Sequence, residues 1–460
     1  MKHEVDTLVV GGGIAGLAYA HGLGADADVA LLEAADRLGG LIRTGTHEDV
    51  HYEWGPEALQ DNAPETMALL DELGLRRADA DPAAKKRYIL DASRRPVEVP
   101  TGPGAFLRSP LLSLGGKLRA FTEPWRSGDK GLDGSIADFV RHRLGRQILE
   151  RLVDPAISGI YAGDPELLSF RGAFPAAHDL VAGHGSILRG MMAKGREKRE
   201  AREAAGEPPQ PRKSPSLLSV AGGLERLPEA LGAALGGGVR TGCRLARVRR
   251  LEDGRWEAST AEGESWSARR LVLGVPAGAA GKLLEQDEPE LSQQLGSMVT
   301  EAVVSLIHVW GRDQVRHPLD AFGYLVPSGL GMSHLGTLFS SSIQPERCPG
   351  ERVMLRTLMG GARRPELVEQ SDEQLLQIVR DEVGATLGLS GEPLWSCVVR
   401  WPAALPRYDL HQVQRQATID ALLAERPGLS IVGNHRKGIS VNALIESSRS
   451  LAREHRGAHA

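Results

Sequence analysis

The sequence predicts an α/β fold assembled from discontinuous segments, combined with an α+β part and a helical insertion. Three observations support this prediction. An apolar strand at residues 7–10 runs through a glycine-rich turn into a helix at 14–23. The same order of strand, turn and helix returns near the end of the chain, with a strand at 429–434 and a helix at 442–453. Between them, residues 101–214 have a helical and irregular pattern.

The first turn has the composition of a nucleotide-binding turn. Gly11, Gly13 and Gly16 allow a tight turn, and they let backbone N–H groups approach a pyrophosphate at a helix N-terminus, where the helix dipole favours an anion. The next strand, 29–32, ends at Glu33, 17 residues past Gly16. A carboxylate there can accept both ribose hydroxyls and would repel the 2′-phosphate of NADP.

The segment after Glu33 separates flavin enzymes from simple NAD enzymes. Arg37 brings a cation toward the same pyrophosphate, and Gly39-Gly40 adds two flexible backbone units. The sequence therefore predicts FAD rather than NAD, with an ordinary strand-to-helix turn that binds no ligand as the alternative.

The remaining elements are read from periodicity and turn residues. A helix at 64–73 closes at Gly74, a hairpin covers 87–99, and an amphipathic helix covers 136–152. The α/β character then returns, with strands predicted at 239–248, 256–260, 266–267 and 271–277. Residues 300–400 alternate strands and loops with one helix at 372–387, which predicts a mixed sheet.

These elements divide the chain into three units. The predicted fold class is a Rossmann-type FAD-binding domain assembled from discontinuous segments, with a mixed-sheet substrate domain and a helical insertion. The FAD-binding domain takes residues 1–85, 216–295 and 406–460. The substrate domain takes a hairpin at 86–100 and residues 296–405, and the insertion takes 101–215.

Composition excludes several function classes. A formal net charge of −4 and a pI near 6.4 argue against nucleic acid as a partner. Three widely spaced cysteines indicate a reducing compartment, with neither a disulfide framework nor a sulfur-ligated metal site. The polar N-terminus runs directly into the first strand and no apolar run reaches about 18 residues, so we expect a cytoplasmic protein or one resting on the cytoplasmic membrane face.

Several blocks of the chain resemble one known family. They are Gly11–Leu17, Glu33–Gly40, Gly55-Pro56, Ser158–Pro165, Phe322–Ser341, Met359–Arg363 and Gly433–Val441. The sequence is similar over nearly its whole length to the oxygen-dependent protoporphyrinogen oxidases, in the monoamine oxidase and phytoene desaturase group of flavoproteins. The three blocks at 158–165, 322–341 and 433–441 are the specific ones.

The resemblance implies a set of noncovalent FAD contacts at matching positions. These are Gly11, Gly12, Gly13, Ile14, Ala15, Gly16, Glu33, Arg37, Gly40, Leu41, Gly55, Pro56, Glu57, Ala58, Leu245, Asn434, Ile439, Ser440 and Val441. The last group makes physical sense, because backbone N–H groups at a helix start suit the electron-rich edge of a reduced flavin.

The resemblance also implies substrate contacts at Arg95, Gly159, Leu325, Leu338 and Leu358. One arginine pairs with a propionate, and the apolar residues enclose the macrocycle. A large apolar ring with two carboxylates needs this combination of a charged rim and an apolar slot. For each leucine taken alone, ordinary core packing is the favoured interpretation. No residue presents itself as a catalytic acid or base.

The implied reaction is oxidation of protoporphyrinogen IX to protoporphyrin IX in heme biosynthesis, with six electrons passing in three flavin cycles and O₂ reduced to H₂O₂. Coproporphyrinogen III oxidation is the first alternative, and its four propionates would favour extra cations such as Arg94, Arg95 and Arg363. An amine oxidase or desaturase, or a flavoprotein without turnover, is a further alternative.

Two interactions are also expected from the family's habits. A peripheral membrane contact would use an apolar patch in the insertion, rimmed by basic residues; its members are Phe106, Leu107, Leu111, Leu112, Leu114, Phe121 and Trp125 with Arg108, Lys117 and Arg119. The charged segment 194–213 is expected to be a solvated helix end and loop, with a contact to anionic lipid headgroups as the alternative. A homodimer is compatible with the sequence.

Overall fold

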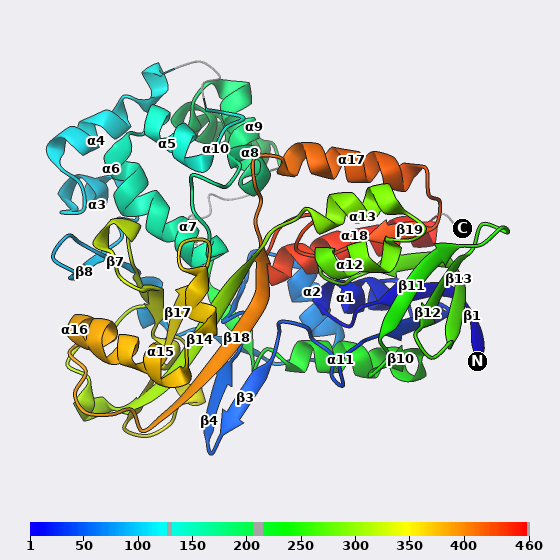
Figure 1. The fold of residues 1–460 in the computed structure, drawn as a ribbon. Helices are drawn as coiled ribbons and strands as arrows, with labels where there is room; N and C mark the ends of the chain where they lie inside the picture. Colours follow the sequence, from blue (N-terminus) through cyan, green and yellow to red (C-terminus); the bar gives the residue numbers. More distant parts are fainter. Residues whose placement is uncertain (127–130, 206–214, 458–460) are drawn as a thin grey trace.

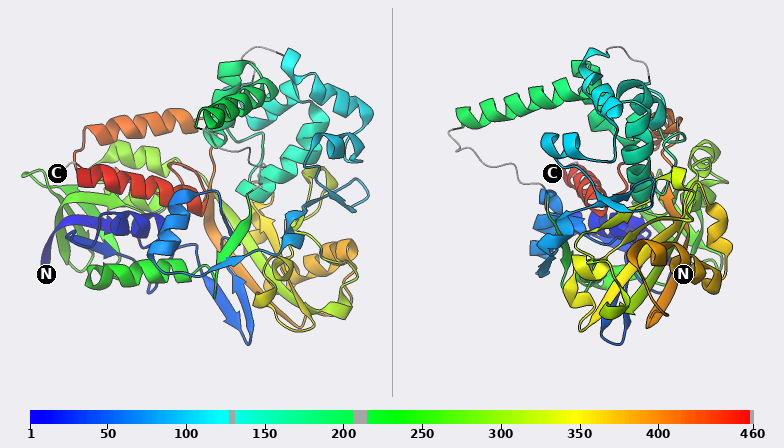
Figure 2. Two further views of the ribbon diagram at one scale, coloured as in Figure 1. Left: turned by 180° about the vertical axis from the view of Figure 1, so that it is seen from behind. Right: turned by 90° about the vertical axis from the view of Figure 1, so that its left-hand side faces the viewer.

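The computed structural model describes residues 1–126, 131–205 and 215–457. Figure 1 shows an α/β unit that contains both ends of the chain, a second sheet beside it, and a group of helices above that second sheet. The two further views in Figure 2 show the same three units, with the helical group standing on one side of the molecule.

The first sheet is built from distant parts of the chain. Its strand order is β10-β2-β1-β13-β12-β11, and β19 pairs with β13. The pairs β1–β2, β1–β13, β2–β10 and β13–β19 are parallel, whereas β11, β12 and β13 form an antiparallel meander. The strands are β1 (Lys2–Val10), β2 (Val29–Leu32), β10 (Val239–Arg240), β11 (Leu245–Arg250), β12 (Trp256–Thr260), β13 (Ser265–Leu273) and β19 (Leu429–Ile431).

Both faces of this sheet are covered, which explains why β1 ends in the continuous apolar run Leu8-Val9-Val10. Val9 packs into the core on one face, while Leu8 and Val10 pack into the core on the other. The helices around the sheet are α1 (Ile14–Gly22), α2 (Pro64–Glu72), α11 (Arg226–Leu235), α12 (Ala277–Leu284), α13 (Pro289–Gly296), α17 (Gln412–Ala424) and α18 (Val441–Gly457). A Cβ at Gly22 of α1 would lie 2.8 Å from Ala452 Cβ of α18, so these two helices pack closely.

The second sheet has the order β18-β14-β17-β16-β15-β7-β8 and is antiparallel except between β15 and β7. Its strands are β7 (Tyr88–Leu90), β8 (Pro96–Glu98), β14 (Thr300–Gly311), β15 (Gly323–Leu325), β16 (His334–Leu338), β17 (Arg352–Gly360) and β18 (Trp395–Pro406). One face packs against α15 (Asp372–Ile378), η9 (Val379–Val383) and α16 (Gly384–Leu387). The other face is turned toward the helical group.

The helical group has a core of its own, which includes the stacked rings of Phe139 and Phe170. It comprises α3 (Pro103–Arg108), α4 (Leu114–Phe121), η2 (Glu123–Trp125), α5 (Ile136–Arg143), α6 (Arg146–Ile148), η3 (Leu149–Val153), α7 (Asp154–Tyr161), α8 (Phe170–Ala173), α9 (Pro175–His184) and α10 (Ile187–Ala204).

Short sheets and helical turns connect the units. They are the hairpin of β3 (Thr44–His47) with β4 (Val50–Glu53), and the sheet of β5 (Leu59–Gln60), β9 (Leu217–Val220) and β6 (Arg77–Asp79). The remaining elements are η1 (Pro82–Lys85), η4 (Gly236–Gly238), η5 (Arg312–Gln314), η6 (Ser328–Leu330), α14 (Ser340–Ile343), η7 (Pro345–Arg347) and η8 (Pro365–Glu369).

Four predicted elements differ from the structure. The helix predicted at 136–152 is broken at Gly145, whose φ of +97° is not helical. The strand predicted at 239–248 is in fact two strands, β10 and β11, which pair with β2 and with β12 at opposite edges of the sheet. The chain turns between them at Gly242, whose φ is +66°. The strands predicted at 266–267 and 271–277 are the single strand β13, which ends at Leu273.

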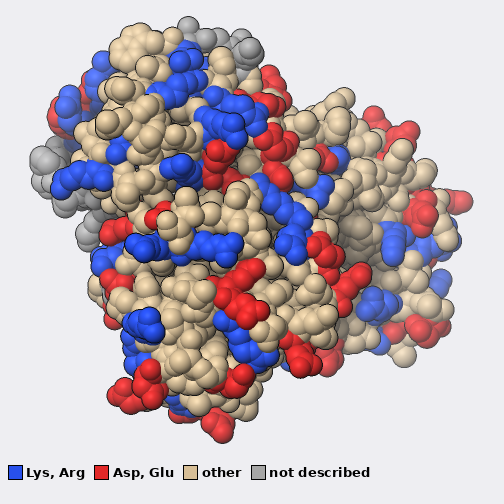
Figure 3. All heavy atoms as spheres, turned by 60° about the vertical axis from the view of Figure 1, so that its left-hand side comes forward, with Lys and Arg blue, Asp and Glu red and all other residues tan. Residues whose placement is uncertain are grey.

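The surface of the helical group differs from the predicted apolar patch. Leu111 and Leu112 belong to the core, at 2% and 3% exposed. Lys117 is buried and its Nζ donates to a backbone carbonyl, as does the Arg119 guanidinium, so neither cation rims a patch. The large apolar side chains that remain exposed in this group include Leu107, Leu114, Leu118, Phe121, Trp125, Leu188, Met191 and Met192. Figure 3 shows this part of the surface at upper left, with blue Lys and Arg among tan residues.

Within the described ranges, no helix is both long and apolar enough to cross a bilayer. The predicted charged segment 194–213 is exposed helix α10 up to Ala204, and residues 206–213 of it lie outside the described residues.

Candidate functional site

The first glycine turn leaves open space at the start of α1. The N–H of Gly11 donates to the Leu32 carbonyl (2.7 Å), and a Cβ at Gly16 would lie 2.1 Å from the Gly11 carbonyl oxygen. These contacts require glycine at position 16. In contrast, a Cβ at Gly13 would meet no atom within 4 Å. Because Gly13 caps α1 without a side-chain hydrogen bond, the helix N-terminus faces this space with its backbone alone.

The second pair of glycines lies against the first turn. Gly39 N–H donates to the Gly12 carbonyl (2.8 Å), and a Cβ at Gly40 would lie 3.4 Å from Gly13 Cα. Farther along, a Cβ at Gly55 would lie 2.0 Å from the Leu41 carbonyl oxygen. Backbone without side chains therefore lines a strip from the start of α1 to Gly55, and a long cofactor can approach such a strip closely.

Glu33 follows β2 at its carboxyl end, which is where a carboxylate that accepts from the ribose hydroxyls is expected. Its Oε2 accepts from Gly12 N–H (2.6 Å) and its Oε1 from Ala35 N–H (2.8 Å). Each carboxylate oxygen keeps a lone pair for a further donor. Leu245 is brought near by backbone pairing, because Cys243 N–H donates to the Glu33 carbonyl (2.8 Å).

The Arg37 guanidinium contacts the backbone of the Gly39-Gly40 loop. It donates to the carbonyls of Leu38, Gly40 and Ile42 at 2.9, 2.7 and 3.2 Å. In this structure the cation therefore braces the Gly39-Gly40 loop from within.

The segment 55–58 carries an ion network that the sequence did not predict. The Glu57 carboxylate pairs with Arg347 (3.0 Å) and Arg356 (3.1 Å), so its side chain is turned away from the glycine strip. Arg347 also pairs with Glu53 (3.0 Å) and donates to Ser219 (2.6 Å). Burial raises the pKa of Glu53 to about 7, although the Arg347 charge acts in the opposite direction. No short motif could have signalled these pairs, since nearly 300 positions separate their members.

The carboxy-terminal residues reach the same region. Ser440 precedes α18 and its Oγ accepts from Ala443 N–H (3.2 Å), while Asn442 Nδ2 donates to the Gln60 carbonyl (2.9 Å). Ile439 to Val441 thus lie close to the segment that follows Ala58. Asn434 accepts from the Tyr408 hydroxyl through its backbone carbonyl (2.5 Å).

Beside Asn434, His435 is 1% exposed, and neither of its ring nitrogens has a hydrogen-bond partner among the described residues. Burial lowers the pKa of His435 to about 4, so the ring is neutral at pH 7. Buried polar atoms normally have hydrogen-bond partners, so the two unpartnered nitrogens of His435 indicate that a polar group can be accommodated next to residues 434–441.

Four of the five predicted substrate residues meet on one face of the second sheet. Leu325 of β15 and Leu358 of β17 both pair with Gly336 of β16, so the three form a row across the sheet. A Cβ at Gly159 of α7 would lie 2.5 Å from Leu325 Cδ2, which places this helix directly over the row. Leu338 lies two residues farther along β16 on the same face and is half-buried.

Arg95 is not brought into this group by any side-chain contact. It is exposed at the turn between β7 and β8, after Arg94 at φ +59°, and its backbone N–H donates to Asp91 Oδ1 (3.0 Å). Just before β7, the Arg87 guanidinium lies 5.4 Å from the centre of the Phe322 ring.

A chain of buried polar side chains lies behind the leucines. Tyr324, Thr337 and Thr357 each adjoin one of them in sequence and therefore point to the opposite face. Trp310 can only donate through Nε1, so His308 accepts at Nδ1 and donates from Nε2 to Thr357. With heavy-atom distances of 2.6 to 3.1 Å, the chain runs through Trp310, His308, Thr357, Thr337, Tyr324, His334 and Glu382. It ties the strands that carry Leu325, Leu338 and Leu358 into one register.

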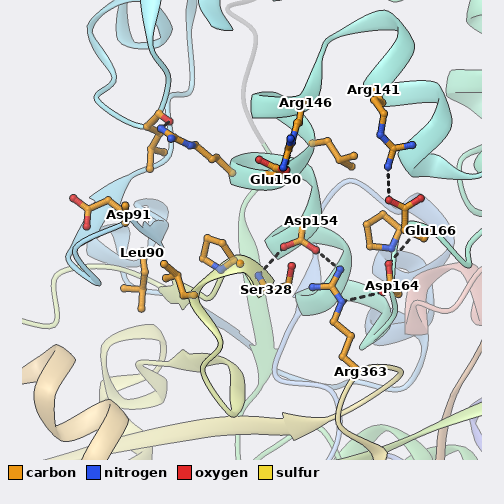
Figure 4. A pocket seen from close by; sticks show the side chains of 18 of the residues that line it. Leu90, Asp91, Arg141, Arg146, Glu150, Asp154, Asp164, Glu166, Ser328 and Arg363 are labelled. Atoms are coloured by element: carbon orange, nitrogen blue, oxygen red, sulfur yellow. Dashed lines mark hydrogen bonds and ion pairs between the residues drawn. The ribbon is translucent and has the colours of Figure 1, made fainter.

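A cavity of about 950 Å³ opens between the helical group and the second sheet (Figure 4). Arg363 lies on its wall and pairs with Asp154 at the start of α7 and with Asp164 (3.1 Å). Asp154 also accepts from Ser328 N–H (2.8 Å). The Arg363 cation, a candidate for a third substrate contact, is thus held by two carboxylates.

The comparisons with known proteins agree with this architecture. The family model described as flavin containing amine oxidoreductase matches residues 14–454. The chain belongs to this family. The predicted resemblance is therefore confirmed, and family membership implies a flavin cofactor.

Individual relatives cover almost the whole chain. A chloroplastic protoporphyrinogen oxidase of Nicotiana tabacum is 31% identical over 98% of this chain and 85% of its own length. A coproporphyrinogen III oxidase of Bacillus subtilis (strain 168) is 25% identical over 98% of this chain and 97% of its own. A solved structure from Exiguobacterium sp. 255-15 has a TM-score of 0.81 at 24% identity, covering 99% of both chains. The predicted fold class is confirmed.

Proposed function

We propose that this protein oxidises protoporphyrinogen IX to protoporphyrin IX with O₂ as the electron acceptor. The substrate loses six electrons and six protons, and three O₂ become three H₂O₂. The observation that carries the proposal is the match over 98% of the chain to a protoporphyrinogen oxidase, together with the apolar row under α7 at the positions where a macrocycle is expected.

The flavin is FAD and is held without a covalent bond. The pyrophosphate fits the open space beside Gly13 and the ribose fits Glu33, while the far end of the cofactor fits the segments at 55–58 and 439–441. The segment 433–441 contains no cysteine that could attach a flavin. The bound flavin supplies a two-electron acceptor for hydride.

The protein's own residues position and shield the substrate. Leu325, Leu338 and Leu358 present an apolar face that favours the ring over water, and Gly159 lets α7 pack closely against Leu325 at this face. The buried polar chain behind the leucines keeps this face rigid, which is what holding a reacting carbon in position requires. Arg95, on the rim, pairs with one propionate. We assign no catalytic acid or base.

A second activity has a specific observation in its favour. The Bacillus subtilis relative is named a coproporphyrinogen III oxidase and covers as much of this chain as the plant relative. The two substrates differ in carboxylate number, so a comparison of kcat/KM between them separates the two activities.

Purified protein tests the proposal directly. It should be yellow, lose its colour to the supernatant on acid precipitation, and form fluorescent porphyrin from protoporphyrinogen IX in air. A yellow pellet contradicts noncovalent binding. A flavin that dithionite reduces, and protoporphyrinogen does not, indicates a flavoprotein with another role.

We also propose that the protein rests on a membrane surface through the helical group, at the cytoplasmic face. The support is the cluster of exposed apolar side chains that includes Leu114, Leu118 and Trp125, which are 78%, 68% and 77% exposed. Flotation with anionic liposomes should carry the protein upward, and recovery wholly in the soluble fraction would remove this proposal.

A further inference from the structure

The cavity between the helical group and the second sheet adjoins the predicted substrate face on three elements. Asp154 on its wall begins α7, the helix that carries Gly159. Pro327 to Leu330 on its wall follow Leu325 after one residue, Val326. Leu90 to Ser93 belong to the hairpin whose turn bears Arg95. None of the five predicted substrate residues lines the cavity itself, so its ligand chemistry is still to be assigned.

Most of the positive charge on the cavity wall is already neutralised. Arg363 pairs with Asp154 and Asp164, as described above. Arg141 pairs with Glu166, and Arg146 pairs with Glu150 (2.5 Å), as Figure 4 shows.

Arg151 is different, because no carboxylate partner is found for it among the described residues. Its Nη1 donates to the Leu111 carbonyl (2.9 Å), which anchors one end of the guanidinium. An arginine has five N–H donors in a planar fork. The remaining donors are available to a carboxylate that enters the cavity.

The total charge of the wall limits how many carboxylates can enter. Five carboxylates line the cavity against four guanidinium groups: Asp91, Glu150, Asp154, Asp164 and Glu166 against Arg141, Arg146, Arg151 and Arg363. Once the other three arginines are paired with carboxylates of the wall, Arg151 is the lining cation without a carboxylate partner among the described residues. The lining side chains together carry a net negative charge. A single anionic group therefore finds a partner, and each further one meets repulsion.

We propose that Arg151 binds one carboxylate arm of the porphyrinogen in this cavity, and that the acidic wall selects a dicarboxylate substrate over a tetracarboxylate one. This proposal rests on the proposed function. Arg95 and Arg151 would then each hold one of the two propionates of protoporphyrinogen.

The experiment compares variants of the holoenzyme with protoporphyrinogen IX and coproporphyrinogen III. Arg151→Gln should raise KM for protoporphyrinogen about tenfold with kcat within twofold, because carboxylate binding is equal in the ground and transition states. Arg151→Lys should recover part of the loss. Binding of protoporphyrin IX, followed by its fluorescence, should weaken in parallel and needs no turnover.

A matched variant separates a local contact from the total charge. Arg146→Gln removes the same charge from the same wall, yet it removes a cation that Glu150 already occupies, so KM should change less than threefold. Conversely, Glu150→Gln releases Arg146 and removes one negative charge, so it should raise kcat/KM for coproporphyrinogen relative to protoporphyrinogen.

Each result has one meaning. If the wild-type enzyme oxidises neither porphyrinogen, the proposed function fails. If it oxidises protoporphyrinogen while Arg151→Gln and Arg146→Gln have equal effects, Arg151 is not the carboxylate site. If Glu150→Gln leaves the ratio between the two substrates unchanged, the wall does not select by charge.

Discussion

Replacing Gly13 with alanine separates folding from cofactor binding. The backbone at Gly13 has φ −74° and ψ 172°, a conformation that any residue adopts, and a Cβ there would meet no protein atom within 4 Å. The Gly13→Ala apoprotein should therefore fold as well as the wild type, and the lower entropy of its unfolded chain should stabilise it by about 0.4–1 kcal/mol.

The same methyl group would occupy the space assigned to the FAD pyrophosphate. Forcing an extra methyl into filled space costs about 1–3 kcal/mol. At about 1.4 kcal/mol per factor of ten, the Kd for FAD should rise by about 5- to 150-fold. Apoprotein titrated with FAD, followed by quenching of flavin fluorescence, measures this change, and thermal melting of the apoprotein measures folding.

Gly183→Ala provides the matched control. Gly183 lies in α9 of the helical group, and a Cβ there would also meet nothing within 4 Å. This variant should bind FAD as the wild type does. If Gly13→Ala also binds FAD with unchanged affinity, the pyrophosphate does not lie at the N-terminus of α1 and the reasoning is wrong.

Three further predictions concern charged residues. Arg95→Ala should raise KM for protoporphyrinogen far more than it lowers kcat; an unchanged KM in steady-state assays would make Arg95 a surface residue. Arg363→Met should lower the free energy of unfolding by about 3 kcal/mol, because Asp154 is 2% exposed and loses its cation, and urea titration measures this loss. Glu53 should make stability depend on pH, since burial raises its pKa from 4.5 to about 7. A carboxyl with a raised pKa stabilises the fold fully below pH 4.5 and loses that contribution as pH rises through 7. Glu53→Gln should therefore show a smaller fall in urea midpoint between pH 5 and 7.5, and an identical fall would exclude this role.

Sequence reasoning succeeded where neighbouring residues carry the information. The strand, glycine turn and helix at 7–23 and the carboxylate of Glu33 interact within about 30 positions, and each residue type has one local reason to be there. The helix break at Gly145 and the turn at Gly242 were missed although both glycines were visible, because periodicity alone does not tell a tolerated glycine from one with positive φ.

At the substrate face, the hydrophobic pattern of the sequence does not distinguish substrate-binding leucines from core leucines. A leucine in a slot and a leucine in the core look alike in sequence, and only the strand register brings Leu325, Gly336 and Leu358 into one row beneath Gly159. Leu111 and Leu112, expected on the surface, are instead in the core of the helical group.

The sequence by itself determined the flavin-binding architecture, because its glycines and its acidic strand end act through local backbone geometry. The tertiary structure decided which charges are available. Glu57 is paired with Arg347 and Arg356, Arg363 is paired with Asp154 and Asp164, and Arg151 keeps open donors. The physical reason is that ion pairs form between side chains that folding brings within about 4 Å, and their separation along the chain leaves no periodic or local signal of that proximity.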